Sequence, residues 1–262
     1  VMARNKVTNV FVPPTAIRII ANHQGVVPQL SVRAVGAAGE QLGAQTHAAA
    51  SAIFNAPINE FYGQTECNAI IGSSHKLGVN DPASMGRAIP GHQVKVSDEH
   101  GEINDHGHGE IVIKADTPVA MLEYFEDPTA TADKISNGWI RTGDVATLRR
   151  DGSFEFQSRN DDVITSAGYR IGPSEIEECL RAHPNVAEAA VVGIPDKERT
   201  ETIAAFVTIK DKTDELNLPD TLKVWVKNRL SAHLYPRRVE IVDAIPTTES
   251  GKIIRRAFRK RA

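Results

Sequence analysis

The sequence predicts a chain of mixed α/β and α+β class with one to two domains, and three observations support this. The chain has 262 residues, against about 150 for a common domain. Hydrophobic residues make up 41% and charged residues 24%, which is usual for globular proteins and excludes a disordered chain. Apolar residues recur at a helical period in some segments and at a period of two in others, so both helices and strands are expected.

The first third of the chain is expected to alternate strands and helices. Residues 10–12 form a short apolar run that stops at a proline pair, which favours extended structure. A helix is expected over 14–21, where apolar residues share one face. Residues 30–35 alternate in polarity and predict a strand that runs into a turn at 36–40. The alanine-rich segment 42–54 predicts a second helix.

From about residue 85 the apolar period changes to two. Val94 and Val96 precede a polar turn at 97–101 that leads to Ile103, and 111–113 form another apolar run. Residues 154–156 follow an Asp-Gly turn, which is a common hairpin signal. An antiparallel sheet or a small distorted β-barrel is therefore expected in this part of the chain.

The last hundred residues predict a small α+β unit. Ser174 and Glu177 fit a capping box that precedes an apolar helix face. The runs 189–194 and 203–209 predict strands. A second helix is expected through Leu222, Trp225, Val226 and Leu230, and a further strand over 239–242. With a boundary near 159–162, the expected domains are 1–160 and 161–262.

Charge, cysteine content and hydropathy exclude several classes of protein. The net charge is −3, so no overall basic field would recruit nucleic acid or anionic lipid. The two cysteines, Cys67 and Cys179, cannot form a disulfide framework, so we expect a cytoplasmic protein. No apolar run approaches the roughly 18 residues of a membrane span. The chain begins Val1-Met2, which suggests a fragment. The sequence does not predict an oligomeric state.

Two segments place hydroxyls and carboxylates where phosphate chemistry could use them. In the segment 62–66, Thr65 can donate to a phosphate oxygen and Glu66 can hold Mg²⁺, which prefers oxygen ligands. The alternative is a solvated turn. Asp144 follows the apolar residues Trp139 and Ile140 and could accept the two hydroxyls of a ribose. The alternative for Asp144 is a carboxylate that caps a turn.

The remaining polar motifs carry weaker signals. Gly251-Lys252 resembles a phosphate loop only superficially, because Pro246 and Ile253 occupy the required Gly and Ser/Thr places. Lys252 still presents a positive charge suited to a phosphate or carboxylate, or is an ordinary surface lysine. His106 and His108 are interpreted as turn residues, since no further metal ligands can be assigned. The basic C-terminal end is interpreted as a solvated face rather than a nucleic-acid site.

In combination and order, these motifs resemble the adenylate-forming (AMP-binding) superfamily, with acyl-CoA synthetases of the acetyl and medium-chain kind the most similar. The resemblance runs from about Thr8 to the C-terminus. It rests on the motifs Tyr62-Gly-Gln-Thr-Glu, Met85-Gly-Arg, Pro90-Gly, Arg141-Thr-Gly-Asp, Ser158-Arg-Asn-Asp-Asp, Ala167-Gly-Tyr-Arg-Ile, Ser174-Glu-Ile-Glu and Ser250-Gly-Lys. The family's Ser/Thr/Gly-rich phosphate loop is absent. The resemblance therefore implies the end of a large ATP-binding domain, with its barrel subdomain, plus a complete mobile C-terminal domain.

The resemblance also implies roles for individual residues. Those expected to contact ATP or AMP are Gly39, Glu40, Tyr62, Gln64, Thr65, Asp144, Arg159, Arg170 and Lys252. Among these, Thr65 touches the α-phosphate and Lys252 bridges the α-phosphate and the substrate carboxylate, while Glu66 holds Mg²⁺. Asp161 is the hinge, and the path for CoA runs along Ser166, Ala167 and Gly168.

The implied reaction joins a carboxylate to ATP, giving acyl-AMP and pyrophosphate, and then transfers the acyl group to CoA. The alternatives are an adenylation domain that loads a carrier protein, and a non-catalytic nucleotide-binding or interaction module. The chain alone is expected to be inactive because the phosphate loop is missing. Small residues at Gly36, Ala37 and Gly63 predict an acyl pocket for medium-length or aryl acids rather than acetate. For Gly63 the alternative is a glycine needed for the backbone conformation before Thr65.

Two positions depart from the family pattern. Glu123 stands where the family usually has a glycine before Tyr124. Another glycine is frequent in the family near Thr200. If the backbone at Glu123 has a positive φ, the glutamate is strained there. Neither position is a ligand in the family, so both departures concern local geometry.

Overall fold

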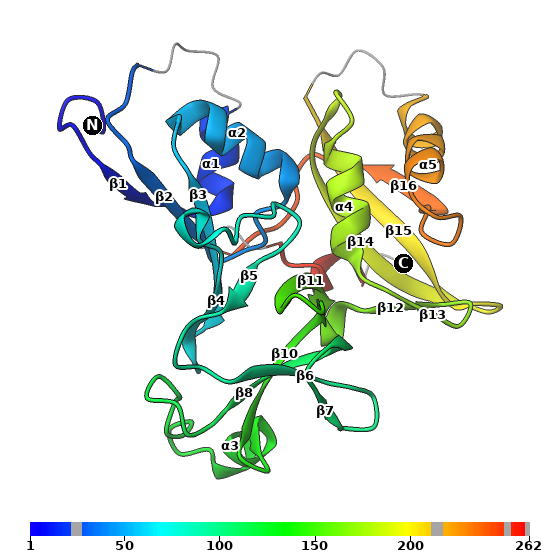
Figure 1. The fold of residues 1–262 in the computed structure, drawn as a ribbon. Helices are drawn as coiled ribbons and strands as arrows, with labels where there is room; N and C mark the ends of the chain where they lie inside the picture. Colours follow the sequence, from blue (N-terminus) through cyan, green and yellow to red (C-terminus); the bar gives the residue numbers. More distant parts are fainter. Residues whose placement is uncertain (22–27, 211–216, 249–252, 260–262) are drawn as a thin grey trace. The chain divides into compact units, whose positions relative to one another are not determined.

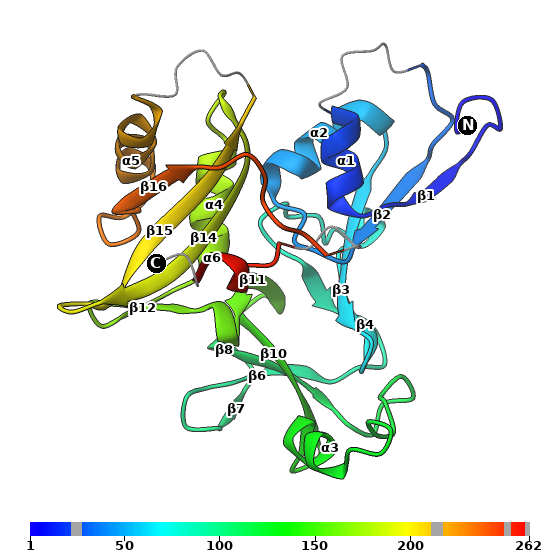
Figure 2. The same cartoon turned by 180° about the vertical axis from the view of Figure 1, so that it is seen from behind.

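The computed structural model describes residues 1–21, 28–210, 217–248 and 253–259. These residues divide into two compact units, Val1–Phe156 and Gln157–Ala262, which Figures 1 and 2 show from opposite sides. None of the helices in the described ranges has the length and hydropathy that a bilayer crossing requires.

The first unit opens with parallel strands packed against two helices. The elements are β1 (Asn9–Phe11), α1 (Pro14–Ala21), β2 (Ala34–Ala38), α2 (Ala44–Phe54) and β3 (Ile58–Gln64). Strand β2 lies between β1 and β3 and is parallel to both. Both helices lie beside these strands (Figures 1 and 2), and a shared core includes Ile17, Val35, Ala50, Phe54 and Ile58. Burial of these apolar side chains is the main force that holds this layer together.

Strand β2 begins later and extends further than the period of the sequence predicts. The expected strand covered 30–35, with 36–40 as a turn, whereas β2 spans Ala34–Ala38. Pairing decides the difference, because Asn9 lies opposite Ala34 and Phe61 lies opposite Ala38. Hydrogen bonds from both neighbouring strands therefore extend β2 through the small residues that looked like a turn.

The rest of this unit is largely antiparallel. Its elements are β4 (Asn68–Gly72), η1 (His75–Leu77), β5 (Gly86–Ala88), β6 (Val94–Ser97), β7 (Ile103–Asn104), β8 (Gly107–Lys114), α3 (Pro128–Lys134), β9 (Ile135–Ser136), β10 (Trp139–Leu148) and β11 (Ser153–Arg159). The strands follow the order β1-β2-β3-β4-β5-β11-β10-β8-β6-β7, and β9 pairs with β10.

Of the two expected arrangements, an antiparallel sheet or a small distorted β-barrel, the structure has the sheet, with no closed barrel among the described strands. Over the described residues the strands form one open path whose ends are β1 and β7. Strand β4 pairs with β3 on one side and β5 on the other, so the antiparallel part continues the parallel sheet and does not close on itself.

His108 was also expected in a turn, but it lies in β8 opposite Thr147. No group of three or more metal-ligating side chains occurs in the described part of the chain.

The second unit has the expected α+β composition. Its elements are η2 (Asn160–Asp162), β12 (Ile164–Ser166), β13 (Tyr169–Ile171), α4 (Pro173–Arg181), β14 (Val186–Asp196), β15 (Thr200–Ile209), α5 (Leu218–Arg229), β16 (Arg238–Ile241) and α6 (Arg256–Arg259). The strand order is β13-β12-β15-β14, with β16 parallel to β15. The second helix ends at Arg229, and Leu230 is its C-cap residue.

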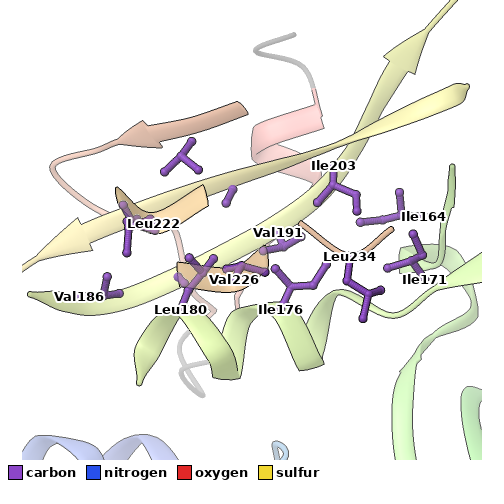
Figure 3. Packing of buried hydrophobic residues seen from close by; sticks show 14 of the residues in the cluster. Ile164, Ile171, Ile176, Leu180, Val186, Val191, Ile203, Leu222, Val226 and Leu234 are labelled. Atoms are coloured by element: carbon purple, nitrogen blue, oxygen red, sulfur yellow. The ribbon is translucent and has the colours of Figure 1, made fainter. Parts of the chain in front are cut away.

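The central hairpin of this unit is buried on both faces. Helices α4 and α5 cover one face, where Ile176, Leu180, Leu222 and Val226 meet alternate residues of β14 and β15 (Figure 3). The other face packs against Phe258, whose ring stacks on Phe206 with centroids 4.4 Å apart. Because both faces are apolar, these strands appear in the sequence as continuous apolar runs rather than alternating ones.

The predicted capping box at the start of α4 is wrong. The N-cap residue is Gly172, which makes no side-chain cap, and Pro173 and Ser174 already lie inside the helix. Glu177 is 2% exposed, and its carboxylate accepts a hydrogen bond from the Val191 amide at 2.9 Å. Glu177 therefore joins α4 to β14 instead of closing the first turn of the helix.

Of the two departures from the family pattern, only Thr200 has a strained backbone. Its φ is 71°, whereas Glu123 is not among the described residues with positive φ. A β-branched residue is costly in the left-handed region.

We expect Thr200→Gly to stabilise the second unit by about 1 kcal/mol. This net gain is the backbone strain that glycine relieves, reduced by the greater conformational entropy of glycine in the unfolded chain. Urea denaturation measures this change.

Thr208→Gly is the matched control for Thr200→Gly. Thr208 lies in the same strand opposite Glu188 and is not among the positive-φ residues. Its replacement should lower stability, because glycine weakens the interior of a strand. Equal losses for the two variants would contradict the strain at Thr200.

Candidate functional site

The carboxyl ends of two parallel strands lie at one edge of the first unit. Ala38 at the end of β2 lies opposite Phe61 of β3, so the turn that follows β2 lies near the segment beginning at Tyr62. Gly39 in that turn has a φ of 102°, a conformation that favours glycine. Ligands of α/β sheets usually bind outside the carboxyl ends of parallel strands. Four of the predicted nucleotide contacts, Gly39, Glu40, Tyr62 and Gln64, lie at or just beyond the ends of β2 and β3.

Glu40, the neighbour of Gly39, is held by helix α1. Its carboxylate accepts hydrogen bonds from the Thr15 amide at 2.8 Å and from the Thr15 hydroxyl. Arg18 pairs with the same carboxylate at 2.7 Å. The Glu40 side chain therefore anchors the turn to α1, and a contact from Glu40 to a ligand would come from its backbone.

Asp144 is a buried carboxylate with two side-chain donors from β3. It is 5% exposed and lies where the pairing of β10 with β8 is interrupted between Arg141 and Val145. The Tyr62 hydroxyl donates to Asp144 Oδ2 at 2.7 Å, and Gln64 Nε2 donates to the same oxygen at 3.0 Å. The Thr142 hydroxyl accepts the Asp144 amide at 3.1 Å, which holds the backbone of this irregular segment.

Tyr62 is fixed as a neutral donor. Burial raises the pKa of Tyr62 well above its usual value, and the negative charge of Asp144 raises it further. The phenol therefore keeps its proton near neutral pH, and its hydrogen bond orients the Asp144 carboxylate over the whole physiological range.

Glu66 lies two residues beyond Gln64, on the turn between β3 and β4. Its carboxylate Oε1 accepts a hydrogen bond from the Tyr124 hydroxyl at 2.7 Å and lies 3.8 Å from Lys134 Nζ. The Glu66 carbonyl accepts the Met121 amide at 2.8 Å, which ties the turn to the segment before α3. Hydrogen bonding to Glu66 raises the pKa of Tyr124 to about 12, so Tyr124 also remains a donor at neutral pH.

The donor set at this turn fits Mg²⁺. The Glu66 carboxylate, next to the exposed Thr65, offers hard oxygen ligands. The described residues contain no group of three or more acidic, His or Cys side chains that could hold a metal by themselves. Mg²⁺ is commonly bound by one or two carboxylates together with substrate phosphates and water. Glu66 is therefore suited to share such an ion with a phosphate-bearing ligand.

The second unit presents a tight hairpin turn where the CoA path was expected. Ser166 ends β12 and Tyr169 begins β13, and they pair across Ala167 and Gly168. Both turn residues have positive φ, 50° and 83°, as in a type I′ turn. A side-chain atom added at Gly168 would meet nothing within 4 Å.

The other predicted residues of the second unit lie on its polar surface. Arg159 pairs with Asp161 at 3.5 Å, and Arg170 donates to the Asn160 side chain at 3.4 Å. The Asp161 carbonyl accepts a hydrogen bond from Arg259 at 2.7 Å. Lys252 lies outside the described residues.

Comparison with known proteins identifies the family. The family model described as AMP-binding enzyme matches residues 1–125, and the model described as AMP-binding enzyme C-terminal domain matches residues 175–252. The chain belongs to the AMP-binding enzyme family. The predicted resemblance to the adenylate-forming (AMP-binding) superfamily is confirmed by these matches.

Curated relatives of this chain include CoA ligases. The chain is 37% identical to the uncharacterized acyl–CoA ligase YtcI of Bacillus subtilis, covering 97% of this chain and 49% of that protein. It is 36% identical to 4-hydroxybutyrate–CoA ligase 1 of Metallosphaera sedula, covering 97% of this chain and 46% of that one. The chain thus spans about half the length of the relatives it matches.

Solved structures of other family members have the same fold. The anthranilate CoA ligase AuaEII in complex with anthranoyl-AMP matches with a TM-score of 0.90 and 26% identity, over 99% of this chain and 50% of that one. ATP-bound MatB from Rhodopseudomonas palustris matches with a TM-score of 0.89 and 26% identity, over 98% of this chain and 51% of that one.

The three small residues predicted to line an acyl pocket have different surroundings. Ala37 is fully buried in the core beneath the helices. A Cβ at Gly36 would lie 2.8 Å from the Phe11 ring. A Cβ at Gly63 would lie 1.8 Å from the backbone carbonyl oxygen of Asn68. The geometry at Gly63 supports the alternative interpretation, a glycine required by close backbone approach, and the pocket itself stays a prediction.

Lys134 and Tyr124 contact the predicted site residues Gln64 and Glu66, but the sequence did not predict them as part of the candidate site. Both lie about 60 to 70 positions along the chain from the groups they contact, with separations of 70 for Lys134 and Gln64 and 58 for Tyr124 and Glu66. Neither belongs to a motif whose chemistry is evident from spacing. The only available signal was the position of Tyr124 beside the departure at Glu123.

Proposed function

We propose that the protein to which this chain belongs activates a carboxylic acid with ATP and transfers the acyl group to CoA. A carboxylate oxygen forms a bond to the α-phosphorus of ATP, and pyrophosphate leaves with the electron pair of the broken P–O bond. The CoA thiolate then forms the thioester bond, and AMP leaves. The chain's membership in a family with CoA ligases supports this assignment, and the convergence of Tyr62, Gln64 and Asp144 at one sheet edge carries it.

In this proposal each end of the nucleotide has its own contacts. Asp144 accepts the ribose hydroxyls, with Tyr62 and Gln64 orienting its carboxylate. The backbone at Gly39 and Glu40 borders the adenine. Arg159 assists at the ribose and Arg170 at the phosphates when the second unit adopts its adenylating position.

The proposed phosphate contacts lower the electrostatic barrier of the first step. Bringing a carboxylate to a phosphate joins two anions, so fixed positive charge and hydrogen-bond donors at the developing charge lower the barrier. Thr65 donates to the α-phosphate and Lys252 bridges that phosphate and the carboxylate. Glu66 would hold Mg²⁺, which when bound neutralises phosphate charge and orients the phosphates.

For the second step we propose that the second unit presents a different face. The Ser166–Gly168 turn then borders the pantetheine path, and Asp161 acts as the hinge. Exchanging one face for the other keeps water from the acyl-AMP during adenylation and later admits the thiol. The two free cysteines, Cys67 and Cys179, support our further proposal that the reaction takes place in the cytoplasm.

The first test is isotope exchange between ATP and pyrophosphate in the full-length protein across a series of carboxylic acids. The proposal expects exchange that depends on the acid, and release of AMP that requires CoA. Exchange with acyl transfer only to a carrier protein would instead support an adenylation domain. Nucleotide binding without exchange would support a non-catalytic module.

Asp144→Asn is expected to raise the KM for ATP about 30-fold. Hydrogen bonds to a charged group contribute about 1.5–3 kcal/mol, and the amide loses the charge while it keeps the size. Steady-state exchange at varied ATP measures the effect. Asp98→Asn is a matched control, because Asp98 accepts hydrogen bonds only within its own loop, from His100, Glu102 and Asn104, among the contacts described. An unchanged KM in Asp144→Asn would contradict the proposed ribose contact.

A further inference from the structure

Lys134 lies among the polar groups of Gln64, Glu66 and Thr142, although no motif includes it. It is the last residue of α3, and its side chain is 18% exposed. Lys134 Nζ donates to Gln64 Oε1 at 2.9 Å and to the Thr142 carbonyl at 3.4 Å. An ammonium so largely removed from water needs such acceptors, and here they come from both β3 and β10.

The contact with Lys134 determines which way the Gln64 amide points. An amide has one acceptor oxygen and one donor nitrogen. Because the ammonium can only donate, it selects the oxygen, and the Gln64 nitrogen is left to donate to Asp144 and to the Thr142 carbonyl, each at 3.0 Å. In the reverse orientation the amide oxygen would face a carboxylate and a carbonyl, which is repulsive. Lys134 thus sets the orientation of the donor that holds Asp144.

Lys134 also places a positive charge 3.8 Å from the Glu66 carboxylate. Both side chains are mostly buried, at 18% and 22% exposure, so solvent screens this interaction less than it would a surface pair. One lysine therefore contacts both predicted ends of the nucleotide site, directly at Glu66 and through Gln64 at Asp144.

We propose that Lys134 is a positioning residue for ATP, acting on the ribose contact through the Gln64 amide. This inference rests on the proposed function, because it assumes that Asp144 receives the ribose. Lys134 itself need not touch the nucleotide: its ammonium orders Gln64, and Gln64 together with Tyr62 orders the Asp144 carboxylate before ATP arrives.

The test compares variants of the full-length protein in ATP–pyrophosphate exchange. Lys134→Ala is expected to raise the KM for ATP about tenfold while kcat falls less than about threefold. Lys134→Arg, which keeps the charge and the donors, should restore the KM to within about threefold of wild type. Lys76→Ala is the matched control, since Lys76 is an exposed lysine of the same unit and should leave both constants unchanged.

Two further measurements separate positioning from a general loss of structure. In a Gln64→Ala background, Lys134→Ala should raise the KM only about twofold further, because its route to Asp144 is already broken. Equilibrium binding of fluorescent ATP and fluorescent 2′-deoxy-ATP should show that loss of the 2′-hydroxyl weakens binding less in Lys134→Ala than in wild type. Thermal denaturation verifies that each variant is folded.

The outcomes distinguish this inference from the proposed function. If wild type shows no acid-dependent exchange, the proposed function fails. If wild type is active but Lys134→Ala has the ATP affinity of Lys76→Ala, only the inference about Lys134 is overturned. Full additivity of Lys134→Ala and Gln64→Ala, or an equal 2′-hydroxyl effect in Lys134→Ala and wild type, likewise overturns the route through Gln64.

Discussion

Gly63→Ala is expected to lower adenylation of every carboxylic acid by about 100-fold or more. The added Cβ would lie 1.8 Å from the Asn68 carbonyl oxygen and 2.9 Å from the Ala69 Cα. Both are backbone atoms of the strand paired with β3, so no side-chain rotation relieves the clash. The backbone between Tyr62 and Glu66 must shift, and a misplacement of about 1 Å at a reacting centre costs about 100-fold in rate.

The distribution of the loss over substrates decides the role of Gly63. We expect acetate, hexanoate and benzoate to lose kcat/KM equally in the exchange assay, and Gly63→Trp to behave in the same way. Gly78→Ala is the control. A Cβ at Gly78 meets nothing within 4 Å, although the φ of 70° there also favours glycine. If Gly63→Trp instead favoured acetate and rejected only the longer acids, Gly63 would be the wall of an acyl pocket.

Arg255→Ala is expected to destabilise the second unit by about 3–5 kcal/mol. The Arg255 guanidinium donates to both oxygens of Glu177, at 2.9 and 2.7 Å, and to Asp162 at 3.0 Å. Burial opposes its charge, but the carboxylates of Glu177 and Asp162 hold the pKa of Arg255 above its ordinary value. Removing one partner of a buried pair leaves an uncompensated charge, which is the costly case.

Hydrogen exchange of the β14 and β15 amides measures this loss within the second unit. Arg238→Ala is the matched control: Arg238 pairs with Glu240 at the surface, with 43% and 37% exposure, and should cost less than about 1 kcal/mol. Adding Glu177→Gln to Arg255→Ala should recover part of the stability, since it removes the unpaired charge. An Arg255→Ala variant as stable as Arg238→Ala would contradict the structural role of the buried pair.

Segments with a clear period were predicted well because their signal is local. Helix α1 covers the predicted 14–21, and strands β14 and β15 contain the predicted apolar runs. The capping box failed because Glu177 matches the spacing of a cap, yet its carboxylate has stronger partners in Arg255 and in the Val191 amide. Spacing within a helix contains no information about a partner 78 residues away.

The site shows the same division between local and distant information. Short motifs in the sequence predicted Tyr62, Gln64, Glu66 and Asp144, because each motif lies within a few consecutive residues. Their arrangement was not, since Tyr62 and Asp144 are separated by 82 positions and meet only through the pairing of strands. Lys134 was missed for this reason: its contacts with Gln64 and Glu66 come from folding, and its own segment has no motif.

The sequence by itself determined the family, the division into a larger and a smaller part, and the residue types available for chemistry, because these depend on composition, period and short motifs. Only the tertiary structure decided that the antiparallel strands stay in an open sheet, that the close approach of Asn68 requires Gly63, and that Lys134 orients Gln64. The physical reason is that hydrogen bonds and excluded volume act through space. Their partners come from distant segments, which are brought together by burial of the apolar faces that the local pattern encodes.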